Sequence, residues 1–153
     1  MNKIYLALVF VCASFINLSA QNSTSTLAVD SNATLIEFLS AATYNVKKVD
    51  SINFVILVGN VKIKQGKTLM YGDSIVLNTS NNILEGFGNI HINDADSVHT
   101  YAEYLKYLGN TKKAYLRKKV KLTDGRGVLT TDSLDYDVSI KLGQYTKGGK
   151  LVR

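Results

Sequence analysis

The sequence contains no proline and no tryptophan, and only one cysteine and two histidines among its 153 residues. A single cysteine excludes an internal disulfide framework and a zinc site built on cysteines. Apolar residues make up 46% and charged residues 20% of the chain, so neither disorder nor a multi-span membrane protein fits. The length suits one domain. Because proline often blocks the edge strands of a sheet, we expect sheet edges here to stay open to strand addition, unless edge lysines block them.

The longest apolar run stands near the N-terminus. It covers residues 4–13, follows Lys3 and precedes Leu18-Ser19-Ala20. A charged start, a short apolar middle and a small-x-small exit are typical of a secretory signal peptide rather than a membrane span. We predict that residues 1–20 are a cleaved signal peptide and that the rest of the chain is exported. The polar residues 21–33 are predicted to be a flexible lead-in to one domain over residues 34–153.

Short runs of alternating apolar and polar residues recur along this domain, and such runs are typical of half-buried β-strands. They are Val61-Lys62-Ile63-Lys64, Ile90-His91-Ile92-Asn93 and Val120-Lys121-Leu122-Thr123. Residues typical of turns separate them, namely Gln65-Gly66, Asn81-Asn82, Gly88-Asn89, Asp94-Ala95-Asp96, Gly109-Asn110 and Asp124-Gly125. Over residues 35–46 the pattern does not distinguish a helix from a strand. The pattern therefore predicts an all-β domain.

The alternating runs also repeat at a fixed spacing. Val61, Ile90 and Val120 are 29 and 30 residues apart, and a second recurring position follows each of them twelve residues later. The sequence is therefore an array of about three and a half units. Because one such unit cannot cover its own apolar face, the units must stack, which predicts an elongated antiparallel β-jellyroll or solenoid.

Several phrases of the sequence, in order and at this spacing, resemble the OstA-like family, most closely its Bacteroidetes type. The family includes the periplasmic lipopolysaccharide-transport protein LptA and the N-terminal domain of the outer-membrane assembly protein LptD. The resemblance covers about residues 35–152. The phrases are Gly59-Asn60-Val61-Lys62-Ile63, Met70-Tyr71-Gly72-Asp73-Ser74, Gly86-Phe87-Gly88-Asn89-Ile90-His91-Ile92, Leu105-Lys106-Tyr107-Leu108-Gly109-Asn110-Thr111-Lys112 and Leu129-Thr130-Thr131-Asp132-Ser133-Leu134-Asp135-Tyr136.

The resemblance implies a fold, a place and a partner. The fold would be a twisted β-jellyroll whose two sheets splay to leave an apolar groove for the acyl chains of lipid A. The protein would lie in the periplasm and join other jellyroll domains of lipopolysaccharide transport, or further copies of itself, head to tail through its edge strands. No cofactor is implied.

The alternating strands supply a row of apolar residues on one predicted face. The row either packs two sheets into a closed core or lines a groove for lipid, and the sequence leaves both readings open. Each buried methylene contributes about 0.8 kcal/mol, so a groove could bind acyl chains without enzyme chemistry. The candidate lining residues are Val61, Ile63, Ile75, Leu77, Ile90, Ile92, Tyr104, Val120, Leu122, Leu134 and Tyr136.

Lysines are the candidate contacts for the phosphates and acidic sugars of such a lipid, since charge-assisted contacts would orient it. The alternative is that they only solvate the surface. Nucleic acid is not an expected partner, because the sequence shows neither a recognition helix nor an aromatic nucleic-acid motif. The candidates are Lys62, Lys64, Lys118, Lys119 and Lys121.

The sequence does not predict an enzyme. The alternation places Asp132 on the face opposite to Asp135, whereas paired-carboxylate catalysis needs acids that face each other across a cleft. His91 is predicted to be a solvated, outward edge residue, and Asp94-Ala95-Asp96 lacks the further oxygen ligands of a calcium loop. We therefore expect a non-enzymatic protein without metal or cofactor, and the resemblance to the OstA-like family implies that it binds and transports lipopolysaccharide. The alternative is an interaction module of a larger envelope protein that assembles through edge strands without lipid.

Overall fold

The computed structural model describes residues 36–145 and 148–152 of the chain. The predicted signal peptide and lead-in lie outside this range. The described part is built of β-strands, and no helix in it is long and apolar enough to cross a membrane. The strands are β1 (Ile36–Ser40), β2 (Thr43–Val49), β3 (Ile52–Gln65), β4 (Thr68–Asn78), β5 (Ile83–Asp94), β6 (Val98–Leu108), β7 (Lys113–Thr123), β8 (Val128–Asp137), β9 (Leu142–Gln144) and β10 (Lys150–Val152).

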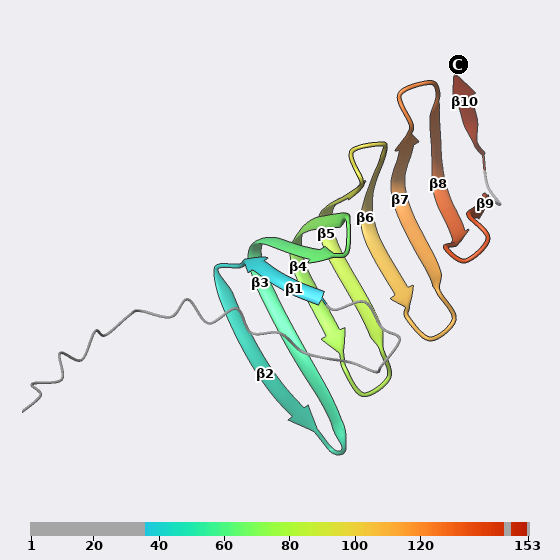
Figure 1. Ribbon diagram of the computed structural model, residues 1–153. Helices are drawn as coiled ribbons and strands as arrows, with labels where there is room; N and C mark the ends of the chain where they lie inside the picture. The colour runs from blue at the N-terminus through green and yellow to red at the C-terminus, as the bar shows by residue number, and fades with distance from the viewer. Residues whose placement is uncertain (1–35, 146–147, 153) are drawn as a thin grey trace, which may run out of the picture.

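The ten strands form one antiparallel sheet in the order β1-β3-β4-β5-β6-β7-β8-β10, in which β2 also pairs with β3 and β9 with β8. Figure 1 shows the strands following one another along the length of the molecule, with the N-terminal and C-terminal strands at opposite ends. Of the ambiguous stretch, residues 36–40 lie in β1 and residues 43–46 in β2, because their backbone pairs with β3. The predicted all-β class and antiparallel roll are therefore confirmed.

Each long strand is interrupted near its middle, where the pairing register shifts between Val58 and Val61 in β3 and at the matching place in the strands that follow. In β3, β5 and β7 two successive residues have positive φ at this point. They bend the strand. We call each bend a corner and use the same name for the matching register shift in β4, β6 and β8. The corner residues are Gly59-Asn60 (φ 83° and 47°), Gly88-Asn89 (69° and 45°) and Lys118-Lys119 (64° and 51°).

Gly88-Asn89 is interpreted from the sequence as a boundary between strands, and the structure corrects this, because β5 continues through it. Glycine and asparagine are the residues that adopt the left-handed region most readily. An extra pair of such residues inside a strand produces a bulge and a sharp bend instead of a turn.

The corners fold the sheet into two limbs with a shared apolar interior. The first limb contains residues 52–58 and the strand segments paired beside them, and the second contains residues 61–65 and their neighbours. Buried residues of both limbs form one cluster. Those of the first limb are Val55, Leu57, Ile75, Leu77, Leu84, Leu105, Ala114, Leu116 and Leu134, and those of the second are Val61, Ile63, Ile90, Ala102 and Val120.

Ile90 shows how tightly the limbs meet at the corners. A Cβ atom added to Gly86 would lie 2.8 Å from Ile90 Cδ1, and one added to Gly72 would lie 2.9 Å from the same atom. The two glycines therefore make room for the Ile90 side chain, which is 1% exposed. Full burial of such a side chain stabilises the fold by about 1.5–3 kcal/mol.

Candidate functional site

The apolar interior between the limbs contains nearly all of the predicted lining residues. Val61, Ile63, Ile75, Leu77, Ile90, Val120 and Leu134 are buried in it. Ile92, Leu122 and Tyr136 pack against this core and are partly buried. The relative exposure of the buried group does not exceed 5%, so in the middle of the molecule the interior is a closed core.

Tyr104 is the exception, and its predicted position in the lining is wrong. The register shift between Tyr101 and Tyr104 reverses the alternation in β6, so Leu105 faces the interior and Tyr104 faces outward. The Tyr104 hydroxyl donates a hydrogen bond of 2.5 Å to Glu85 Oε1. Partial burial and this hydrogen bond to a carboxylate raise the pKa of Tyr104 to about 12.

Interior-facing apolar side chains are exposed at both ends of the roll. Tyr44 and Val46 lie opposite buried residues of β3, so they point to the interior side, yet they are 46% and 65% exposed. Phe38 of β1 meets the Tyr44 ring edge to face at a centroid distance of 5.9 Å. At the other end, Leu151 of β10 pairs with Leu129 and is 58% exposed. The sequence did not reveal these residues, because residues 35–46 were ambiguous between helix and strand and because β10 has only three residues.

Two of the predicted cationic residues lie on the outer face of the second limb. Lys64 forms an ion pair of 3.5 Å with Glu37. The Lys62 ammonium lies 5.3 Å from the centroid of the Tyr71 ring, a distance at which a cation is attracted to the ring face. Lys62 and Lys64 therefore already have partners on the protein surface.

The other three predicted cations gather at the corner of β7. Lys119 Nζ lies 2.7 Å from Glu103 Oε1, a contact that lowers the pKa of Glu103 and raises the pKa of Lys119. Lys118 precedes it, and the Lys121 ammonium lies 5.8 Å from the centroid of the Tyr101 ring. The structure thus brings Lys118, Lys119 and Lys121 together and separates them from Lys62 and Lys64.

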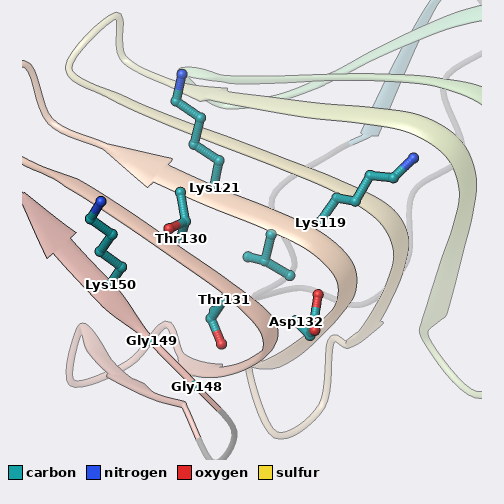
Figure 2. A pocket seen from close by; sticks show the side chains of 9 residues that line it. Lys119, Lys121, Thr130, Thr131, Asp132, Gly148, Gly149 and Lys150 are labelled. Carbon is teal, nitrogen blue, oxygen red and sulfur yellow. The ribbon is translucent and has the colours of Figure 1, made fainter.

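A shallow pocket of about 490 Å³ adjoins this corner. Figure 2 shows that β10 contributes Lys150 to it, on the other side from Lys119 and Lys121. Lys150 is not among the cations predicted from the sequence, although its distance of 29 residues from Lys121 follows the repeat. The pocket is lined by Lys119, Val120, Lys121, Thr130, Thr131, Asp132, Gly148, Gly149 and Lys150.

His91 differs from the prediction of a solvated edge residue. It faces outward, but it belongs to β5 in the middle of the sheet and stacks between Tyr71 and Tyr101 at centroid distances of 5.4 and 4.5 Å. Its Nε2 lies 3.1 Å from Nδ1 of His99. Desolvation and the neighbouring His99 lower the pKa of His91. The pairing of β5 with β6, which brings His99 to His91, could not be deduced from alternation alone.

The acidic residues considered for catalysis do not face one another. Asp135 is on the outer face of the first limb, where Arg117 Nη1 lies 2.7 Å from its Oδ1. Asp132 lies at the corner of β8 and lines the pocket. Among the residues that the structure describes, no group of three or more His, Cys, Asp or Glu side chains could hold a metal ion.

By its fold, the protein belongs to the class of all-β proteins whose single antiparallel sheet is bent into two limbs around an apolar interior. Residues 33–153 match the family described as OstA-like protein, so the chain belongs to the OstA-like family. No curated protein matches the chain.

The fold is similar to that of LptH from Pseudomonas aeruginosa, described as the LptA-homologous periplasmic component of the conserved lipopolysaccharide transport device. The TM-score is 0.67 at 14% sequence identity, over 77% of this chain and 94% of LptH. The protein therefore has an LptA-like fold.

Proposed function

We propose that this protein is a non-enzymatic periplasmic component of lipopolysaccharide transport, which binds the acyl chains of lipid A in its interior and forms part of a bridge to the outer membrane. The observation that carries the proposal is an apolar interior that is continuous through the molecule and exposed at both ends, at Tyr44 and Val46 and at Leu151. Membership of the OstA-like family and the description of LptH support it. The predicted signal peptide agrees with a periplasmic location.

Lipid would enter by separating the limbs, starting at an exposed end. Each strand bends at its corner, where the regular pairing is already interrupted. An acyl chain that inserts between the buried side chains of the two limbs exchanges one apolar surface for another, so the side chains of the interior stay out of water. Each methylene that leaves water contributes about 0.8 kcal/mol, so about ten methylenes provide a gross gain of about 8 kcal/mol against the cost of separation.

The bridge would use the two edges of the sheet. At the C-terminal edge, β9 and β10 pair with β8 as β7 does on its other side. At the N-terminal edge, β1 and β2 pair with β3 as β4 does. A β1–β2 edge of another copy, or of a related jellyroll domain, could therefore continue the ladder after β10. The chain carries no proline to block this addition.

Photo-crosslinking in cells tests lipid binding directly. A photoreactive residue at Val46 or Leu122 is expected to capture lipopolysaccharide, because both positions face the interior. The same residue at Phe87, which is 42% exposed on the outer face of the first limb, is the matched control and is expected to capture none. Failure of both interior positions to capture lipid would contradict the proposal.

A second candidate function is an interaction module that assembles through its edges without lipid. The closed middle of the interior favours it, since Ile75 is 0% and Leu105 is 1% exposed. Native mass spectrometry of the protein purified from the periplasm separates the two functions. Bound lipid supports the transport function, whereas lipid-free oligomers support the module.

A further inference from the structure

The corner of β7 departs from the other corners in its residue types. The corners of β3 and β5 use Gly-Asn, whereas β7 places Lys118 and Lys119 at φ values of 64° and 51°. For a side chain with a Cβ atom and no short polar group, the left-handed region is strained. The sequence therefore keeps two lysines at a place where Gly-Asn would fold with less strain. Residues that hold a strained conformation are concentrated at functional sites.

The surroundings of this corner carry an excess of positive charge. Lys118, Lys119, Lys121 and Lys150 contribute four cations, and Glu103 and Asp132 contribute two anions, which leaves a net charge of +2 (4 − 2). Lys119, Lys121 and Lys150 surround the pocket of about 490 Å³, together with the hydroxyl groups of two threonines. Figure 2 shows the three ammonium groups pointing to different sides of the pocket rim. The charges are thus spread over the rim, which suits a ligand with several negative charges.

We propose that the β7 corner and the adjoining pocket bind a phosphate-type group, and that Lys118 and Lys119 occupy their strained positions because this ligand needs their charges. The inference rests on the proposed function, in which the phosphate belongs to the sugar headgroup of a lipid. Lysine ammonium groups and the hydroxyl of Thr130 provide the charge-assisted and neutral hydrogen bonds that phosphate oxygens accept, whereas the Thr131 hydroxyl already donates to the Ser133 carbonyl at 3.2 Å. The site lies beside β10, whose Leu151 is exposed on the interior side. One lipid could therefore place its acyl chains inside the roll and its phosphate at this rim.

The decisive variant is the double substitution Lys118→Gly and Lys119→Asn, which gives β7 the corner residues of β3 and β5. Relief of strain is expected to raise the midpoint of thermal unfolding by about 3–8 °C. The asparagine that replaces Lys119 can still donate to Glu103, as Asn89 Nδ2 donates to Asp73 Oδ2 at 2.8 Å. Loss of two cations is expected to weaken binding of lipid A that carries both phosphates by about 10- to 30-fold.

Two control variants distinguish binding at this site from nonspecific attraction of the lipid to the positive charge of the protein. The substitution Lys112→Gly with Lys113→Asn removes the same charge at the other end of β7 and replaces another residue of positive φ, Lys112 (53°). It is expected to leave lipid A affinity unchanged. The substitution Lys118→Arg with Lys119→Arg keeps the charge and is expected to keep the affinity. Equal loss of affinity in the two Gly-Asn variants would overturn the site.

The choice of probes distinguishes the source of the phosphate. Binding is measured with lipid A, with lipid A lacking both phosphates, and with inorganic pyrophosphate followed by the NMR shifts of the Lys118 and Lys119 amides. Weaker binding of the phosphate-free lipid supports the site, and equal binding overturns it. If the protein binds lipid A and the Gly-Asn variant at the β7 corner binds it equally well, the site is wrong and the proposed function stands. If pyrophosphate shifts the amides but lipid A does not bind, the site stands and the proposed function is wrong. If neither probe binds, both are wrong.

Discussion

The contact between Ile90 and Gly86 predicts a strong coupling between two small substitutions. In the native sequence, the new Cβ of Gly86→Ala would lie 2.8 Å from Ile90 Cδ1, and its next neighbours, Ile90 Cγ1 and Leu105 Cβ, would lie at 3.8 Å. Overpacking of this kind typically costs about 1–3 kcal/mol. The substitution Ile90→Val removes the Cδ1 atom alone and should cost about 0.5–1.5 kcal/mol.

In the double variant the two effects should not add. Without Ile90 Cδ1, the new Cβ at position 86 has only ordinary van der Waals neighbours, and replacing glycine in a strand then stabilises the fold by up to about 1 kcal/mol. Gly86 has no positive φ that would oppose alanine. We expect Gly86→Ala to destabilise the native sequence and to be neutral or stabilising in the Ile90→Val background, a coupling of at least about 1 kcal/mol. Urea unfolding of the four proteins with unchanged m-values measures it. Additive free energies would refute this account of the corner.

Three further predictions follow from single side chains. His91 has a pKa lowered from 6.5 in the folded state, so unfolding takes up a proton, and the free energy of unfolding should fall as the pH drops below about 6.5. Denaturant titrations across this range should show a weaker pH dependence for His91→Gln, and an unchanged slope would contradict the assignment. Tyr104→Phe should lower the free energy of unfolding by about 1 kcal/mol through loss of the hydrogen bond to Glu85, without weakening lipid binding; a parallel loss of lipid binding would place Tyr104 inside the roll. Val46→Asp should change stability by less than about 0.5 kcal/mol, since Val46 is 65% exposed, but should reduce lipid capture at the N-terminal end. Unchanged capture would exclude this end as a lipid contact.

The strands could be predicted from the sequence because their signal is local. The alternation in Val61-Lys62-Ile63-Lys64 reports the two faces of one strand, and the recurrence at Ile90 and Val120 reports the stacking of like units. Both survive in the structure, where these apolar residues are buried and the intervening Lys62, His91 and Lys121 face outward. The candidate interior was therefore largely predictable.

The sequence-based predictions were wrong where the face of a residue depends on how the strand alternation continues through a corner. Alternation assigns faces from one residue to the next, but the alternation breaks at the corner of β6, where Ala102 and Leu105 are both buried, so Tyr104 lies on the opposite face from the one predicted. The same limitation made Gly88-Asn89 a predicted strand boundary. Only the register with the neighbouring strand shows that the chain continues.

The sequence by itself determined that the protein is an all-β roll of repeated units, because strand alternation and repeat spacing are properties of the chain in one dimension. The tertiary structure decided that the interior is closed in the middle and exposed at Val46 and Leu151, and that Lys119, Lys121 and Lys150 line one pocket. These features depend on how far each corner bends and on which residues pair across strands. Bending and pairing bring together residues that are far apart in the sequence, and no local pattern contains that information.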